Sequence, residues 1–192
     1  MRVIAGSAGG IQLVVPETGV RPTMDRVKAA IFSSLGEQVI GARVLDLFAG
    51  AGGLGIEALS RGAAAALFVE KNSAAVRFIE QNFIRTKLRG RVRKQEVFAF
   101  LQSANRNERY DLIFADPPYE KAKTGGTFTR LLLEEETLPH LLESSGVFVL
   151  EKRPAEELLD PGRWEISRAR KYGATEVLFL QLPGGAAEKH NA

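Results

Sequence analysis

Residues 43–55 read RVLDLFAGAGGLG, and the rest of the chain can be placed around this stretch. The apolar run from Val44 to Phe48 predicts a buried strand, and residues 56–59 predict a helix after a glycine-rich turn. A strand, a glycine turn and a helix form the unit that binds nucleotides in open α/β sheets. Its glycines tolerate positive φ and let a ligand approach the backbone. The turn fits the pattern G-x-G-x-x-G at Gly50, Gly52 and Gly55.

The acidic residue before this turn narrows the choice of ligand. Asp46 would repel a pyrophosphate, because like charges repel. The same carboxylate suits a ligand that carries an ammonium and a sulfonium group, and the sequence therefore predicts S-adenosylmethionine (SAM) as cofactor. Two alternatives remain open here. One is a glycine turn without a ligand, and the other is a nicotinamide-dependent oxidoreductase, which the glycine pattern and Glu70 also allow.

Composition limits the class of protein. A chain of 192 residues with 45% hydrophobic and 26% charged residues predicts one soluble domain, here 1–183. Within it, residues 1–40 form a hairpin-and-helix appendage, and 184–192 are expected to be a disordered tail. The absence of cysteine excludes disulfides, thiolate zinc sites and a cysteine nucleophile, and two histidines argue against a histidine metal site. No apolar run reaches the ~20 residues of a membrane span, so we expect a cytoplasmic protein with neither a metal nor a membrane partner.

Strand and helix patterns alternate along the chain. This alternation predicts a mostly parallel sheet with helices on both faces, an antiparallel hairpin at its C-terminal edge, and a small N-terminal hairpin followed by a helix from Thr23. A single helix is expected over 128–142. The expected strands are 2–5, 11–15, 43–48, 65–69, 91–96, 110–115, 146–151, 164–169 and 176–182.

Acidic residues follow three of the predicted parallel strands. Ligands of open α/β sheets bind outside the carboxyl ends of the strands, near the point where the strand order reverses. Asp46 stands near the carboxyl end of the first strand. Glu70 ends the second, at a spacing typical of an acid that holds ribose hydroxyls. Glu96 ends the third, where a side chain would lie beside an adenine; an exposed strand-end acid is the other interpretation.

The most informative motif is Asp116-Pro117-Pro118-Tyr119, at the end of the fourth strand. Two prolines fix φ and remove two backbone donors, so the turn presents bare acceptors. Asp116 and the Pro117 carbonyl can accept both hydrogens of an exocyclic amino group, and Tyr119 offers a face on which a base can stack. The motif predicts catalysis by orientation of an amine toward a methyl donor.

The glycine turn and Asp116–Tyr119 together resemble class I SAM-dependent amino-methyltransferases. The blocks 21–28, 45–62 and 171–175 are similar to the RsmD family, which methylates N2 of a guanine in bacterial small-subunit (16S) ribosomal RNA. The resemblance runs from residue 1 to about 182. It implies ribosomal RNA as the partner. A small enzyme with few base-reading elements would depend on an assembled small-subunit particle for recognition, and naked RNA stays open as the other substrate. The resemblance implies catalytic roles for Asp116, Pro117 and Tyr119, and cofactor contacts from Asp46, Phe48, Gly50, Gly52, Glu70, Lys71, Glu96, Val97, Arg21 and Thr23.

Basic residues favour a nucleic-acid partner only weakly at a net charge of +3. Residues 85–94 hold six basic side chains and no acid, so they are either a solvated loop or a patch that follows phosphates. Lys121 and Lys123 follow the proline turn and are better placed to meet RNA. Other functions stay open: methylation of adenine N6 in DNA or RNA, methylation of a protein glutamine, or RNA binding without catalysis.

Overall fold

The computed structural model describes residues 1–16, 23–118, 127–154, 156 and 161–184. Arg21, Tyr119, Lys121 and Lys123 lie outside these residues, as do the side chain of Thr23 and residues 185–192 of the tail. None of the helices that the structure describes is long and apolar enough to cross a membrane.

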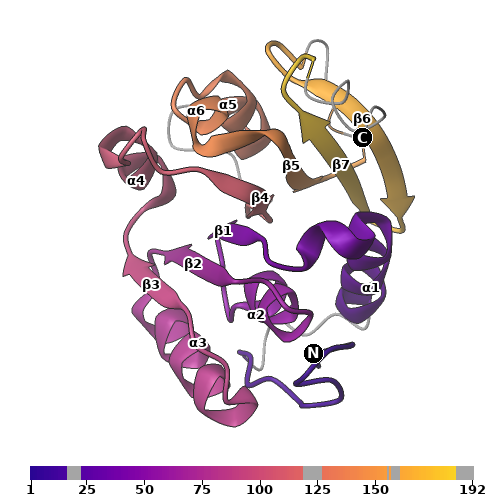
Figure 1. The fold of residues 1–192 in the computed structure, drawn as a ribbon, viewed down its shortest axis with the longest axis vertical. Helices are drawn as coiled ribbons and strands as arrows, with labels where there is room; N and C mark the ends of the chain where they lie inside the picture. Colours follow the sequence, from indigo (N-terminus) through magenta and orange to yellow (C-terminus); the bar gives the residue numbers. More distant parts are fainter. Residues whose placement is uncertain (17–22, 119–126, 155, 157–160, 185–192) are drawn as a thin grey trace.

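The described residues form one seven-stranded sheet in the order β3-β2-β1-β4-β5-β7-β6 (Figure 1). The first five strands in this order are parallel, and β7 runs antiparallel to both β5 and β6. The predicted parallel sheet with an antiparallel C-terminal hairpin is therefore confirmed. The strands are β1 Arg43–Leu47, β2 Ala65–Glu70, β3 Arg91–Lys94, β4 Tyr110–Ala115, β5 Leu142–Lys152, β6 Glu165–Tyr172 and β7 Thr175–Gln181.

Helices cover both faces of the sheet, as the alternating pattern predicted (Figure 1). The helices are α1 Thr23–Leu35, α2 Gly53–Ser60, α3 Ser73–Thr86, α4 Val97–Ser103, α5 Phe128–Glu134 and α6 Leu138–Leu141, with a 3₁₀ turn η1 at Gly36–Val39. One core holds side chains from α1, α2 and α3, and the other holds side chains from α4, α5 and α6. Strand side chains alternate between the two cores: Val44 and Phe114 belong to the first, Leu45 and Ile113 to the second.

Two predicted elements end at other places. The helix expected over 128–142 is wrong: α5 ends at Glu134, and α6 is a separate turn from Leu138. The Glu135 carboxylate breaks the helix by accepting the amides of Thr137 and Leu138 at 2.6 and 2.7 Å. The strand expected over 91–96 stops at Lys94, because the residues that follow enter α4.

The N-terminal residues pack on the sheet domain through a buried glutamate. Glu57 of α2 accepts the amides of Ile4 and Ala5 at 2.7 and 3.1 Å and pairs with Lys28 of α1 at 3.3 Å. The expected hairpin is reduced to a single antiparallel bridge between Arg2 and Gln12. Because a buried charge is stable only when it is paired and hydrogen-bonded, this cluster fixes α1 and the N-terminal segment against α2.

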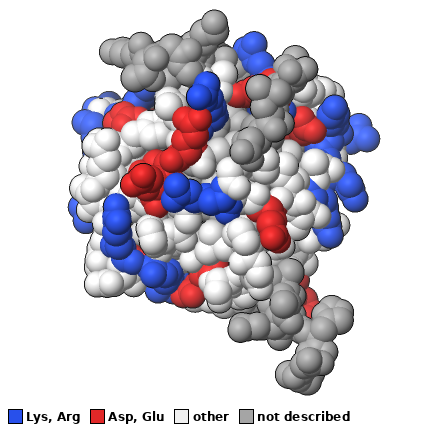
Figure 2. All heavy atoms as spheres, turned by 90° about the horizontal axis from the view of Figure 1, so that it is seen from above, with Lys and Arg blue, Asp and Glu red and all other residues white. Residues whose placement is uncertain are grey.

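Charges of both signs mix on the surface. Figure 2 views the molecule from the end at which β6 lies in Figure 1, and Lys and Arg side chains gather along its right flank. Acidic side chains interrupt the basic ones toward the middle of this view. The small net charge of +3 thus coexists with a local excess of basic side chains on this flank.

Candidate active site at the carboxyl edge of the sheet

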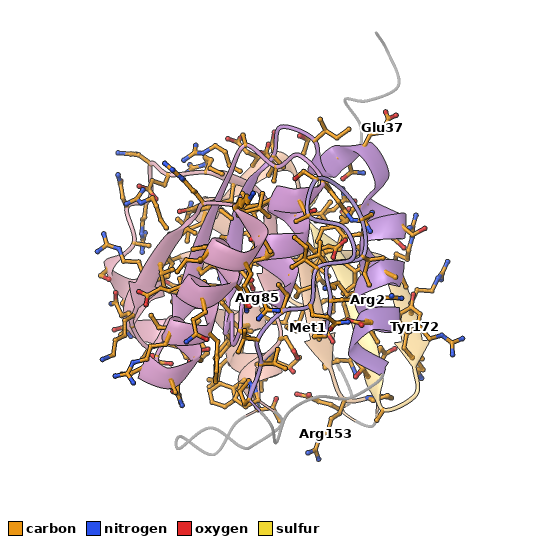
Figure 3. The ribbon with its side chains drawn as sticks, turned by 90° about the horizontal axis from the view of Figure 1, so that it is seen from below. Met1, Arg2, Glu37, Arg85, Arg153 and Tyr172 are labelled. Atoms are coloured by element: carbon orange, nitrogen blue, oxygen red, sulfur yellow. The ribbon has the colours of Figure 1, made fainter. Side chains whose placement is uncertain are left out.

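Four acidic residues line the carboxyl edge of the sheet on one face. Glu70, Asp46, Asp116 and Glu151 come from the ends of β2, β1, β4 and β5, which are neighbours in the sheet. Asp46 pairs with Phe68 and Phe114, and Ala115 pairs with Leu150, so Asp116 lies level with Glu151. The alternation of side chains places all four acids on the α1–α3 face. In Figure 3 this edge faces down: Arg153, which follows β5, lies at the bottom and Glu37, ahead of β1, at the top.

Asp46 is buried within this row. Its side chain is 2% exposed, and its Oδ2 accepts the Gly55 amide of α2 at 2.9 Å. Burial raises the pKa of Asp46 to about 7; the Gly55 hydrogen bond opposes the shift, and the charges of Asp116 and Glu70 add to it. The ionised form of Asp46 is therefore unfavourable at this site, and a cationic ligand bound nearby would stabilise it.

The glycines of the turn have different tasks. Gly50 has φ of 55°, and a Cβ built there would meet nothing closer than a carbonyl 4.0 Å away, so its backbone faces open space. Gly52 has φ of 83°, and its Cβ would lie 3.0 Å from Ile56. A Cβ on Gly55 would lie 2.3 Å from Phe68. Close approach of a ligand is thus a property of Gly50, whereas Gly52 and Gly55 are required by the backbone turn and by packing.

Glu70 holds the glycine turn from the neighbouring strand. Its Oε2 accepts the Gly50 amide at 2.9 Å, and its Oε1 accepts the Asn72 amide at 2.7 Å. Each carboxylate oxygen has a second lone pair, so the oriented carboxylate can still accept ribose hydroxyls. Asn72 caps α3 through the amides of Ala74 and Ala75, while Lys71 is exposed.

The predicted adenine contact at residues 96 and 97 has a clear local structure. The Glu96 side chain caps α4 by accepting the Ala99 amide at 2.9 Å, and Val97 is 2% exposed within the second core. The following residue turns back to the site, because the Phe98 ring lies 6.4 Å from that of Phe48. This arrangement places an aromatic ring, as well as a carboxylate, on the side of the site toward β3.

Three partly buried phenylalanines form a cluster that the sequence did not reveal. Phe128 stacks on Phe98 at 6.1 Å with an interplanar angle of 15°, and its ring lies 5.6 Å from that of Phe48. Phe48 follows β1 with φ of 57°, a conformation that non-glycine residues rarely adopt. The three rings come from the end of β1 and the first turns of α4 and α5. Their spacing in the sequence does not predict that they meet.

The proline turn lies at the centre of the acidic row. Asp116 is exposed, Pro117 is buried and Pro118 is exposed. The register of β4 between β1 and β5 brings Asp116 beside Asp46 and Glu151. Tyr119 follows outside the described residues. The structure thus brings together Asp46, Glu70 and Asp116, the three acids on which the sequence interpretation mainly depends.

Glu151 is a site residue that sequence reasoning missed. It was placed only as the last residue of an expected strand, where a glutamate usually meets solvent. Burial raises the pKa of Glu151 well above its ordinary value, and the negative charges of Asp116 and Asp46 add to the shift. A strand register was needed to find it, because only the pairing of Ala115 with Leu150 puts it beside Asp116.

Comparison with known proteins decides the family. The family described as conserved hypothetical protein 95 matches residues 1–181. Ribosomal RNA small subunit methyltransferase D of Escherichia coli strain K12 is 33% identical over 190 residues, which cover 94% of this chain and 89% of that protein. The chain belongs to the RsmD family. Membership in this family of class I methyltransferases excludes the nicotinamide-dependent alternative, and S-adenosylmethionine is the cofactor of such enzymes.

Solved structures agree with the RsmD fold. A hypothetical protein of Thermus thermophilus is 32% identical and has a TM-score of 0.80, over 95% of this chain and 99% of that one. RsmC, a 16S rRNA N2 methyltransferase of Thermus thermophilus in complex with AdoMet and guanosine, is 22% identical with a TM-score of 0.68. It covers 86% of this chain, which spans 44% of RsmC, and the likeness shows a common fold.

The donor set of the RsmD site fits the cofactor. Acidic side chains suit the ammonium and sulfonium charges, a carboxylate held at Glu70 suits a ribose diol, and the open backbone at Gly50 admits a ligand. Among the described residues, no three or more His, Asp or Glu side chains are grouped so that they could hold a metal ion. The described side chains suit a cationic, hydroxyl-bearing ligand.

Proposed function

We propose that this protein methylates the exocyclic N2 amino group of a guanine in small-subunit ribosomal RNA. The observation that carries the proposal is the position of Asp116 and Pro117 between Asp46 and Glu151, at the carboxyl edge where β1 and β4 are neighbours. This is the edge at which open α/β sheets bind ligands. The relatives named ribosomal RNA small subunit methyltransferase D support the RNA substrate.

The cofactor is held by residues from β1, β2 and the glycine turn. Glu70 binds the ribose hydroxyls while its backbone hydrogen bonds keep its carboxylate in place. Asp46 and the backbone at Gly50 border the methionine part, and the phenylalanine cluster at residues 48, 98 and 128 borders the adenine. Residues 71, 96 and 97 flank this region; the roles that the family resemblance implies for Arg21 and Thr23 concern side chains outside the described residues. When bound, S-adenosylmethionine supplies an electrophilic methyl group on its sulfonium.

The proline turn orients the nucleophile. Asp116 and the Pro117 carbonyl accept the two N–H groups of the guanine amine, and Tyr119 stacks on the ring. Both acceptors lie on a turn whose φ angles are fixed by proline, so little freedom is lost when the amine binds. A hydrogen bond from the amine to a carboxylate also raises electron density on its nitrogen. The reaction therefore needs positioning, and no covalent enzyme intermediate.

The substrate is the assembled small-subunit particle. The described helices and strands all belong to one sheet and the helices that cover it. Among the described residues there is no separate domain that could read bases. A duplex-DNA methyltransferase has to extrude its base and usually carries such a domain. These features favour ribosomal RNA over adenine N6 in DNA, and the particle positions the target nucleotide in place of a separate base-reading domain among the described residues.

The test is methyl transfer by the wild type and by Asp116→Ala. Small subunits from a strain without this protein are incubated with labelled cofactor, and the methylated nucleoside is identified by mass spectrometry. We expect N2-methylguanine at one position with the wild type, and a loss of roughly 10²-fold or more in rate with Asp116→Ala, because a displaced amine misses the methyl group. Cofactor affinity should persist in the variant.

The matched control is Glu134→Ala, which removes an exposed carboxylate of α5 paired only with Arg130 among the described residues. It should leave the rate unchanged. A near-normal rate for Asp116→Ala would reject the role of that residue, and a methylated adenine or glutamine as product would replace the proposed substrate. Naked ribosomal RNA that is methylated as fast as the particle would reject the requirement for assembly.

A further inference from the structure

Glu151, the next-to-last residue of β5, carries a carboxyl group that no cation of the described residues pairs with. No hydrogen bond or ion pair joins this carboxyl to any residue that the structure describes. The next residue, Lys152, points to the opposite face, where its ammonium pairs with Glu176 at 2.9 Å and donates to the carbonyls of Arg153 and Glu156. The nearest cation along the strand is therefore paired on the other face of the sheet and does not neutralise Glu151.

On its own side of the sheet, the charged groups nearest to Glu151 on β4 and β1 are acidic, while Arg170, level with it through Val177, lies two strands away on β6. Asp116 lies beside it on β4, and Asp46 lies one strand further. A carboxyl group taken from water without a partner is costly, and nearby carboxylates increase the cost. Glu151 is thus suited to meet a hydrogen-bond donor on a ligand, at the place where the amine is proposed to bind.

The bases differ in what stands beside their amino group. In guanine the ring N1 carries a hydrogen next to the N2 amino group, so two neighbouring atoms donate. In adenine the ring N1 beside the N6 amino group has no hydrogen. The amide of a glutamine side chain has no ring nitrogen beside its NH₂. Two carboxyl groups on neighbouring strands, whose backbones are about 4.8 Å apart, match a donor–donor edge.

We propose that Glu151 selects guanine by accepting the ring N1–H while Asp116 accepts the amino group beside it. The inference rests on the proposed function and assigns its base specificity. An oxygen of Glu151 accepts N1–H in either protonation state. When the carboxyl holds its proton, its O–H also donates to the guanine O6, which adenine lacks. Glu151 is one methylene longer than Asp116, so its carboxyl reaches further along the same ring edge.

A double comparison of side chain and base tests this assignment. The substrates are small-subunit particles reconstituted with guanine or with 2-aminopurine at the mapped position. 2-Aminopurine keeps the N2 amino group but has no hydrogen on N1. The enzymes are the wild type, Glu151→Leu and Glu151→Gln. We expect Glu151→Leu to lose roughly 10- to 100-fold in kcat/KM on guanine, and little on 2-aminopurine, for which the partner hydrogen is already absent.

Glu151→Gln separates recognition from charge. Its amide oxygen accepts N1–H and its NH₂ donates to O6, so we expect activity on guanine within a few-fold of the wild type. Equal losses of Glu151→Leu on both bases, no loss at all, or a Glu151→Gln variant as poor as Glu151→Leu would each overturn the assignment.

Controls keep folding and the proposed function apart from this inference. Glu143→Leu, at the other end of β5, should leave the selectivity between the two bases unchanged. Melting temperature and cofactor affinity report whether Glu151→Leu folds. If it does not, the ratio of wild-type and Glu151→Gln rates on the two bases decides instead: a wild type that treats guanine and 2-aminopurine alike overturns the inference. A wild type that methylates no guanine amine overturns the proposed function itself.

Discussion

Asp46 is the side chain whose pKa shows most clearly how burial and neighbouring acids act at the site. Its pKa rises from 3.8 to about 7, first because of burial and then because of Asp116 and Glu70. The folded protein therefore binds a proton at Asp46 more tightly than the unfolded chain does. The stability that this proton contributes is complete below pH 3.8 and is lost as the pH rises through 7.

Asp46→Asn should remove this pH dependence. The amide oxygen can still accept the Gly55 N–H but never carries charge, so we expect the cofactor-free variant to lose less stability than the wild type between pH 4 and 8, with the remaining fall due to Glu151, whose pKa is also raised. The titration of Asp46 accounts for at most about 4 kcal/mol of the wild type's free energy of unfolding over this pH range. Denaturant unfolding as a function of pH measures it, with Glu80→Gln on the exposed side of α3 as control. Parallel pH profiles for wild type and Asp46→Asn would contradict it.

At single residues, the sequence names the acidic side chains that stand next to a motif or at a typical spacing from it, and their roles stay predictions. Asp46 and Asp116 adjoin the glycine and proline turns, and Glu70 stands at a spacing typical of a ribose-binding acid, so all three were named in advance. Glu151 adjoins no motif. Whether Glu151 lies at the site depends on which face of β5 its side chain is on and on the pairing of β5 with β4. The register of this pairing shifts between Tyr110 and Leu112. A strand shifted by one residue would turn Glu151 to the other face, and the sequence does not contain that register.

At the scale of elements, α3 connects the glycine turn to the N-terminal segment. Asn82 is fully buried in α3. Its Oδ1 accepts the Val14 amide at 2.7 Å, and its Nδ2 donates to the carbonyls of Val14 and Ala51 at 2.9 and 3.0 Å. Ala51 lies between Gly50 and Gly52, so one side chain holds the cofactor turn and a segment far away in sequence.

Asn82→Ala should weaken both folding and cofactor binding. Three buried hydrogen bonds are lost and Val14 keeps unsatisfied groups, so we expect the free energy of unfolding to fall by about 2–4 kcal/mol. Cofactor affinity should fall as well, because the turn loses an anchor. Gln81→Ala, the exposed neighbour on α3, is the control. Calorimetry of cofactor binding at a temperature where both variants are folded separates the two effects, and an unchanged affinity would show that the turn does not need this anchor.

The order of elements was predictable, and some boundaries were not. Hydrophobic runs and turn residues placed every strand of the sheet approximately, because burial and periodicity are local signals. The break between α5 and α6 depends on the Glu135 side chain accepting two amides, a contact that competes with helix continuation. The end of β3 depends in the same way on Glu96 capping α4.

At the scale of the molecule, basic residues lie on both edges of the sheet but at different heights. The run at 85–94 leads from the end of α3 into β3, and Arg91 pairs with Leu67, well before the carboxyl end of β2. Within this run, only Lys94, opposite Glu70, reaches the site edge. On the other edge, β6 is exposed from Glu165 to Lys171, and Lys171 is level with Lys152 of β5 through Glu176 of β7. Figure 3 shows the end of β6, Tyr172, on the lower half toward Arg153.

This geometry predicts that RNA meets the β6 edge. Asp116 is three strands from β6, about 14 Å, so phosphates beside the target base can reach Arg170 and Lys171. Arg168 is not equivalent, since it donates to the Ser34 carbonyl of α1 and lies over the Phe179 ring. Charged residues on an edge strand also prevent strand pairing between molecules, which is the competing explanation. The basic flank in Figure 2 fits either explanation.

Neutralising two charges on each edge separates these explanations. Arg170→Gln with Lys171→Gln should weaken binding to small-subunit particles and lower the slope of log affinity against log salt by about 2, because two phosphate contacts are lost. Arg89→Gln with Arg91→Gln removes the same charge from the other edge and should change neither quantity. Binding at several salt concentrations measures the slope, and light scattering measures association between copies. If the variant without the Arg170 and Lys171 charges only associates with itself more strongly, these charges protect the edge strand. If the variant without the Arg89 and Arg91 charges loses affinity for the particle instead, the RNA crosses the β3 edge.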